Sequence, residues 1–219
     1  MKLITAFTFV QFKNMSVTLL LILTNVVISL MAFRDRLLFS KLLFRPYFIR
    51  KDREYYRFLS SGFIHADYMH LAINMYVLYI FGVGVEEYFF QIKGESGRII
   101  YLLFYLLAVV VSSVPSFEMR KHDVSYSSVG ASGATSAIVF SSIIFAPWNK
   151  IYLMFIPIGI PAFIFGFIYL IYSYYMSKKG QDNIAHDVHF FGALFGVIFT
   201  LLLDHGILPY FIDSILNGR

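Results

Sequence analysis

The chain has 219 residues, of which 58% are hydrophobic, 19% aromatic and only 14% charged, and its mean hydropathy is +0.70. A chain of this composition cannot hide its apolar surface inside itself, so an ordinary soluble domain is excluded and lipid is the expected solvent. There is no cysteine, which excludes disulfides, cysteine zinc ligands and thiol catalysis. The net charge of +5 comes mostly from one segment and gives little support for nucleic-acid binding.

Six apolar segments follow one another along the chain, and we interpret each as a membrane-spanning helix. They cover residues 17–33, 68–90, 99–114, 132–146, 151–176 and 184–203. Pro115 is expected to close the third span, and Pro157 and Pro161 are expected to bend the fifth. Because open strands cannot stand in lipid, we predict an all-α polytopic membrane protein, a bundle of six transmembrane helices that forms one domain over residues 1–219. No cleavable signal peptide is evident.

The segment between the first two spans, residues 34–63, breaks the apolar pattern. It holds eight of the eighteen Lys and Arg residues, interleaved with Leu, Phe and Tyr. This mixture is typical of an amphipathic element that lies in the membrane interface. A solvated loop would have the same composition, and amphipathicity alone does not decide between the two.

Polar side chains inside the spans are few, and they gather at the same ends of alternate helices. They are His65, His70 and Asn74 at the second span, Ser132 at the fourth, and His186, Asp187 and His189 at the sixth. At about 1.5 Å per residue, Ser132 and His189 each lie about 21 Å from the far end of their span. In a hydrocarbon layer of about 30 Å, this places both about 10 Å below the same face. Polar groups at that depth are costly and usually functional.

Ser132 lies in a segment that reads Val129-Gly130-Ala131-Ser132-Gly133-Ala134, directly ahead of an apolar run. Glycine carries no Cβ, so a partner helix or a substrate carbonyl can come close to this serine. An isolated match of this kind is more often a turn or a contact between membrane helices. The polar residues on the other spans are what favour a functional interpretation.

The chemistry of these residue types suggests their roles. A serine hydroxyl needs a base to take its proton, and histidine is the usual base, so His189 is the candidate. His70 and Asn74 are four residues apart and share one helix face. Together with the backbone N–H of Ser132, they can donate hydrogen bonds to a developing oxyanion.

Two glycines, Gly192 and Gly196, follow His189 on the sixth span. Their small-x3-small spacing lets another helix pack closely, and if that helix is the fourth, Ser132 and His189 can come within hydrogen-bond distance. His186 shares the face of His189 and could be a second base or a metal ligand, but we favour an outer-end residue bonded to loop groups.

Read in chain order, the motifs resemble those of the rhomboid family of intramembrane serine proteases. They are Tyr56-Arg57, His65-x4-His70-Leu71-x2-Asn74-Met75, Gly82 with Glu86, Gly130-Ala131-Ser132-Gly133 and His189-x2-Gly192-x3-Gly196. The resemblance implies a six-helix fold of the bacterial type and a Ser–His dyad, with Ser132 as nucleophile and His189 as base. His70 and Asn74 match the oxyanion-side positions of the family. Structural positions near the site are matched by Arg57, His65, Glu86, Gly130, Gly133, Gly192 and Gly196.

Two positions depart from the family pattern. Tyr56 stands where the family usually has tryptophan before the loop arginine. Ser136 stands four residues after the serine, where many members have an aromatic residue that stacks on the catalytic imidazole. Some other ring, or none, must therefore support His189.

The resemblance implies an endopeptidase that cleaves the transmembrane segments of membrane proteins, in the bacterial cytoplasmic membrane, with its active site on the extracytoplasmic side. Its expected partners are such substrates and the lipid bilayer, without nucleic acid, metal or cofactor; the sequence indicates no oligomeric state. A non-catalytic relative that binds or triages membrane clients is the alternative, and the presence of both Ser132 and His189 favours the protease. A small transporter would show paired repeats, and a zinc protease would carry His-Glu-x2-His; neither pattern is present.

Orientation and substrate entry are the remaining expectations. An N-terminus in the cytoplasm puts twelve Lys and Arg in outer loops and six in inner segments, against the positive-inside rule. We follow the resemblance, because the basic first loop can sit on anionic headgroups. The fifth helix, interrupted by Pro157 and Pro161 and followed by residues 177–183 with Gly180, is the expected gate, opening against the second helix.

Overall fold

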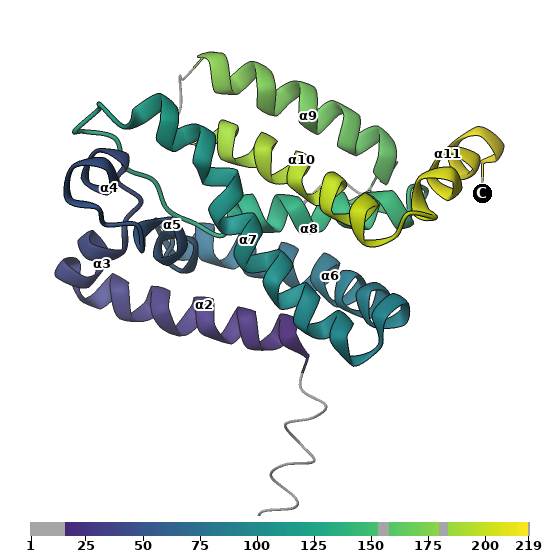
Figure 1. Cartoon of the computed structure of the whole chain (residues 1–219), viewed down its shortest axis with the longest axis horizontal. Helices are drawn as coiled ribbons and strands as arrows, with labels where there is room; N and C mark the ends of the chain where they lie inside the picture. The colour runs from purple at the N-terminus through teal and green to yellow at the C-terminus, as the bar shows by residue number, and fades with distance from the viewer. Residues whose placement is uncertain (1–15, 153–157, 180–183, 219) are drawn as a thin grey trace, which may run out of the picture.

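The computed structural model describes residues 16–152, 158–179 and 184–218. The long helices are α2 (Val17–Arg34), α6 (Tyr68–Lys93), α7 (Glu95–Arg120), α8 (Ser132–Phe145), α9 (Ala162–Lys179), α10 (His186–Leu203) and α11 (Ile207–Asn217). The shorter elements are α3 (Arg36–Leu42), α4 (Pro46–Asp52), α5 (Arg57–Ser60), the 3-10 turn η1 (Ser61–Phe63) and the strands β1 (Lys150–Tyr152) and β2 (Gly159–Pro161). The helices form one bundle, from which α11 extends at the end of the chain (Figure 1).

Within the described residues, four helices are long and apolar enough to cross a membrane, namely α2, α6, α7 and α10. The structure thus supports four of the six predicted spans, and the chain is a polytopic helical membrane protein. α8 has only 14 residues, and α9 is not among the four.

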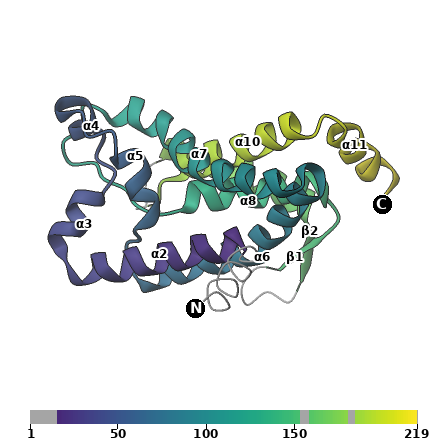
Figure 2. The ribbon, with the colours of Figure 1, turned by 60° about the horizontal axis from the view of Figure 1, so that its bottom comes forward.

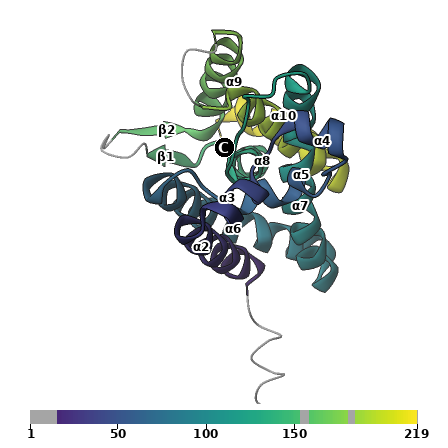
Figure 3. The ribbon, with the colours of Figure 1, turned by 90° about the vertical axis from the view of Figure 1, so that its left-hand side faces the viewer.

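α8 is the central helix of the bundle. It contacts α6, α7, α9 and α10, and Figure 3 shows it in the middle when the molecule is seen from the end that carries α3 and α4. Eleven of its fourteen residues are buried. Because other helices shield it from lipid, α8 does not need the length of a full span, and it can begin below the membrane surface.

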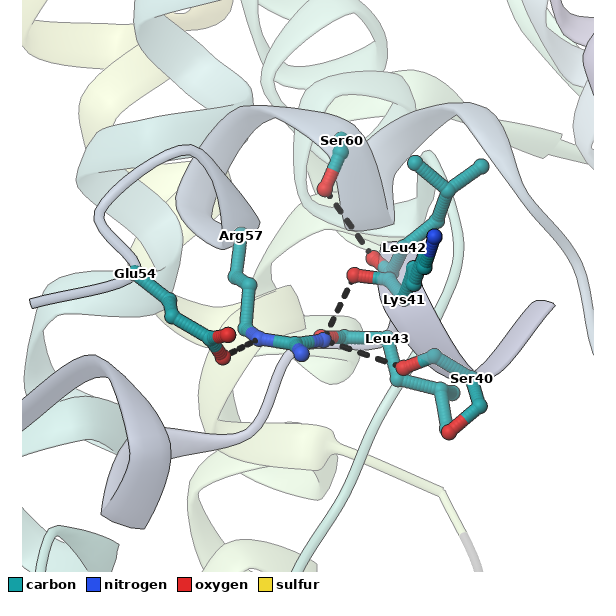
Figure 4. A network of polar contacts seen from close by, with 7 residues as sticks. All are labelled: Ser40, Lys41, Leu42, Leu43, Glu54, Arg57 and Ser60. Carbon is teal, nitrogen blue, oxygen red and sulfur yellow. Dashed lines mark hydrogen bonds and ion pairs between the residues drawn. The ribbon is translucent and has the colours of Figure 1, made fainter. Parts of the chain in front are cut away.

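The basic first loop folds into the short helices α3, α4 and α5. α3, α4 and α5 lie together at one end of the bundle, while the strands and α11 lie at the other (Figure 2). Buried Arg57 ties this region together, because its Nη1 donates to the carbonyls of Ser40, Lys41 and Leu43 and its Nε pairs with Glu54 (Figure 4). A guanidinium with this many partners acts as the cap of α3 and not as a surface charge.

The predicted fifth span, residues 151–176, is wrong at its start. Lys150–Tyr152 and Gly159–Pro161 pair as an antiparallel hairpin, and α9 begins only at Ala162. Pro161 therefore ends a strand and does not bend a helix, and it also disfavours helical backbone in the residue before it. Pro157 lies outside the described residues. The hairpin projects from the bundle (Figure 3), and it corrects the prediction of an all-helical chain.

The predicted end of the third span is also wrong, since α7 continues through Pro115 to Arg120. A proline removes one backbone N–H from a helix but does not oblige it to stop when neighbours hold the next turn. Here Phe117 packs on Phe58 of α5, with ring centroids 5.4 Å apart. α11, for which no element was predicted, is fixed by Trp148, whose Nε1–H donates to the carbonyl of Ser214 at 2.8 Å.

Candidate active site

α8 and α10 run parallel and pack in a regular register through small residues. A Cβ added to Gly192 would lie 2.2 Å from the carbonyl oxygen of Gly133, and one added to Gly196 would lie 2.2 Å from that of Ala137. One turn further on, Thr200 Oγ1 donates to Ser141 Oγ at 2.7 Å. Each of these pairs is 59 residues apart (192 − 133, 196 − 137 and 200 − 141). The helix predicted to face Gly192 and Gly196 is therefore the one that does.

This register brings Ser132 and His189 to nearly the same level. By the same spacing Ser132 corresponds to position 191 of α10, and His189 lies two residues before that position, an axial offset of about 3 Å at 1.5 Å per residue. His189 also lies one turn before Gly192, on the face of α10 that meets α8. Both side chains are partly exposed and line one cavity of about 1780 Å³.

His70 and Asn74 line the same cavity from α6. The Nδ1 of His70 accepts from the N–H of Ala66 at 3.3 Å, so the proton of the neutral ring belongs on Nε2. Asn74 uses one amide hydrogen for the His70 carbonyl at 2.9 Å, and its Oδ1 accepts from Thr135 at 3.2 Å. The carbonyl of Ser132 lies 3.1 Å from the same Thr135 hydroxyl, whose single proton is shared between the two acceptors, and this contact ties the α6 pair to the start of α8.

The loop before α8 places Gly130 against His70. Its N–H donates to the carbonyl of Ser61 at 3.0 Å, and two bonds between Phe44 and Ser128 anchor the loop further back. Gly130 has φ +117, and a Cβ there would lie 2.7 Å from the His70 ring. Only glycine satisfies both the backbone conformation and the contact.

His65 lies behind His70, with ring centroids 5.1 Å apart and nearly perpendicular planes. Its Nδ1 contacts Ser29 Oγ at 2.9 Å, and that hydroxyl also contacts the carbonyl of Phe63 at 3.1 Å. If the hydroxyl donates to the carbonyl, His65 must donate from Nδ1. Burial, followed by the nearby His70, lowers the pKa of His65 from 6.5 to about 3, so the ring is neutral.

The site residues lie within a segment that matches a known protein family. The family model described as "Rhomboid domain" matches residues 52–205, which include all of these site residues. The chain belongs to the rhomboid family.

Three curated rhomboid relatives are similar to this chain. "Rhomboid-like protein 11, chloroplastic" of Arabidopsis thaliana is 31% identical over 164 residues, which cover 68% of this chain and 53% of the relative. "RHOMBOID-like protein 12, mitochondrial" of Arabidopsis thaliana is 27% identical over 156 residues, covering 68% and 46%. "Rhomboid-related protein 1" of Caenorhabditis elegans is 25% identical over 170 residues, covering 75% and 44%. The matched part spans about half the length of each of these relatives.

Glu86 of this rhomboid chain lies away from the site. Its carboxylate accepts from the Ser16 hydroxyl, from the N–H groups of Val17 and Thr18 and from the Thr18 hydroxyl. It thus caps the N-terminus of α2, where a negative charge is favourable. Glu86 lies twelve residues after Asn74 on α6, which is about 18 Å at 1.5 Å per residue. Its role is therefore structural, but the prediction that it lies near the site is wrong.

His189 has an aromatic neighbour that its sequence pattern does not reveal. Tyr169 of α9 lies nearly parallel to the imidazole, with ring centroids 6.5 Å and planes 16° apart. Its hydroxyl lies 2.9 Å from the Oγ of Ser136, the position where many rhomboids have their aromatic residue. No local pattern separates Tyr169 from the other tyrosines of α9, so only the fold identifies it. His186, at the start of α10, packs edge-on against Tyr172 at 5.5 Å.

The described residues, 16–152, 158–179 and 184–218, contain no group of three or more His, Asp or Glu side chains that could hold a metal ion.

Proposed function

We propose that this rhomboid is an intramembrane serine endopeptidase in which Ser132 is the nucleophile and His189 the base. The observation that carries the proposal is the register of α8 and α10, which brings the two residues to one level on facing helices beside one cavity. Both helices are held by backbone-to-backbone contact next to the site, so the geometry is set before substrate arrives. Preorganisation of this kind is what an activated nucleophile requires.

The proposed reaction begins when Ser132 Oγ attacks the scissile carbonyl carbon and its proton passes to His189. The tetrahedral intermediate then collapses, the C–N bond breaks, and His189 returns the proton to the leaving amine. Water, activated by the same histidine, hydrolyses the acyl-enzyme and restores Ser132.

Three donors that can stabilise the oxyanion belong to residues that line one cavity. Ser132 is the first residue of α8, where backbone N–H groups have no partner within the helix and the helix dipole favours negative charge. His70 and Asn74 line the same cavity, and the Nε2–H of His70 and the second amide hydrogen of Asn74 are the donors that their described hydrogen bonds do not use. Losing one such donor typically costs about 100-fold to 1000-fold in rate.

The shape of the cavity supports substrate entry between α6 and α9. Its lining runs from Met69 and His70 along α6, and from Met176 to Phe165 along α9. A transmembrane substrate has its own backbone paired, so the bond to be cut must lie where its helix unwinds, near Gly, Ser or Pro. Pro161 cannot provide the gate hinge in the way predicted, because α9 starts after it. Residues 180–183 of the predicted pliable cap lie outside the described residues.

A reversible cross-link tests this entry route. Cysteines at Met69 and Met176, joined by a cleavable bifunctional thiol reagent, should slow cleavage of a spanning substrate, and reduction should restore it. The chain has no cysteine of its own, so only the engineered pair reacts. The control is the same double-cysteine variant treated with a monofunctional thiol reagent, which modifies both cysteines without linking them. Full activity in completely cross-linked enzyme would show that substrate does not enter between α6 and α9.

The proposed catalysis is tested by cleavage of a single-span model substrate in proteoliposomes, with Ser132→Ala beside the wild type. Cleavage by the wild type alone supports the protease, and the absence of cleavage by correctly folded wild type with several substrates favours the client-binding alternative. The site is proposed to face the extracytoplasmic side. A bacterial cytoplasmic membrane, expected from the sequence, finds no support in the relatives, two of which have names that place them in organelles.

A further inference from the structure

We propose that Tyr169 of α9, held by Ser136 of α8, is a positioning residue that fixes the plane of the His189 imidazole. This inference rests on the proposed function, in which His189 is the base.

The backbone of α10 does not set the orientation of this imidazole. The outer side-chain torsion of histidine joins an sp³ to an sp² carbon, so its preferences are broad and its neighbours decide the ring plane. A base must aim one nitrogen at the serine hydroxyl, so free rotation would remove most productive encounters. His186 approaches edge-on, with planes 73° apart, whereas Tyr169 lies nearly parallel to the imidazole, with planes 16° apart and ring centroids 6.5 Å apart. A flat neighbour allows a ring to slide in its own plane but opposes tilting out of it.

Tyr169 is itself held on several sides. Its ring contacts Phe140 of α8 and Phe165 of α9, with centroid distances of 5.6 and 5.7 Å. α9 can come close to α8 at this level because Gly166, one turn before Tyr169, has no side chain. A Cβ added to Gly166 would lie 3.0 Å from Cδ1 of Ile143. The rings lie within the roughly 4.5–7 Å range of aromatic pairs.

Ser136 completes the arrangement from the helix that carries the nucleophile. It lies one turn after Ser132, is 7% exposed, and its Oγ is 2.9 Å from the Tyr169 hydroxyl. A buried tyrosine hydroxyl normally finds such a partner, and the bond fixes how far the ring reaches across the bundle. Ser136 stands where many rhomboids have an aromatic residue. Here it holds the ring of Tyr169, which α9 supplies.

Kinetic variants separate the ring from the hydroxyl. Tyr169→Leu, which keeps bulk but has no flat face, should lower kcat about 10-fold to 100-fold with KM changed less than about 2-fold, as expected for a misaligned base. Tyr169→Phe and Ser136→Ala should each keep most of the activity, and the double variant should lose no more than one of them, because both remove one shared bond. Tyr175→Leu is the matched control, since this tyrosine of the same helix is 54% exposed.

A spectroscopic readout makes the test independent of catalysis. The imidazole resonance of His189, assigned by its loss in His189→Ala, should move in Tyr169→Leu and stay in place in Tyr169→Phe and Tyr175→Leu. These spectra can be recorded on a Ser132→Ala background, so they remain decisive even if the wild type cleaves nothing and the proposed function fails.

Unchanged kcat in Tyr169→Leu, equal damage from Tyr169→Phe, or an unmoved His189 resonance would overturn the proposal. If Tyr169→Leu does not fold, Tyr169→Met replaces it, because its flexible side chain fills irregular space.

Discussion

Gly192→Ala adds one methyl group at the contact that sets the distance between the two proposed catalytic helices. The new Cβ would lie 2.2 Å from the carbonyl oxygen of Gly133, whereas ordinary contact begins at 3.4 Å, so α8 and α10 must separate by about 1.2 Å there (3.4 − 2.2). The obstructing atom is backbone and cannot rotate away. We expect a loss of about 1–3 kcal/mol in the free energy of unfolding, the usual range for overpacking. Alanine gains about 1 kcal/mol over glycine in a helix, so the net loss is about 0–2 kcal/mol.

The effect on activity should exceed the effect on stability. Ser132 is adjacent to Gly133, and a displacement of about 1 Å between reacting groups can cost about 100-fold in rate. Cleavage of a single-span substrate in proteoliposomes measures the rate, and unfolding in a mixed detergent series measures stability. Gly84→Ala is the matched control, because a Cβ there has no neighbour within 4 Å. Wild-type activity and stability in Gly192→Ala would refute the derived helix register.

Three further predictions follow from the described contacts. Asn74→Ala should slow cleavage about 100-fold to 1000-fold while the unfolding transition is retained, and an unchanged kcat would leave Asn74 as a packing residue. Gly130→Ala should impair folding or cleavage more than Gly84→Ala, because its φ of +117 and its contact with His70 both require glycine; equal behaviour in unfolding and cleavage assays would contradict this. Since the folded pKa of His65 is about 3 against an ordinary 6.5, the unfolded chain takes up a proton first as pH falls. Stability should therefore drop between about pH 6.5 and 3, by up to about 1.4 kcal/mol per pH unit, and His65→Gln should flatten that slope in unfolding experiments at stepped pH.

Periodic features of the sequence were sufficient to predict the contact between α8 and α10, whereas the pairing of Ser132 with His189 stays a prediction. The small residues after His189 predicted a close helix contact, and the apolar run after Ser132 predicted the helix that makes it. Both predictions depend on spacing along a single helix, which is a local property.

What the sequence could not show depends on contacts between distant segments. Pro161 has the same local chemistry in a kinked helix as at the end of a strand, and only pairing of β2 with β1 decides between them. Pro115 likewise reads as a helix end until Phe58 is known to hold the turn beyond it. The pairing of Tyr169 with Ser136 crosses from α9 to α8, so no pattern within either helix reveals it.

The most direct test of the central claim is covalent labelling of the nucleophile. A fluorophosphonate reacts with serine hydroxyls that a base has activated. We expect one adduct per chain by intact mass, located at Ser132 by peptide mapping, absent in Ser132→Ala and strongly slowed in His189→Ala. An adduct at another residue, or labelling of Ser132 at the wild-type rate in a folded His189→Ala variant, would contradict the proposed dyad.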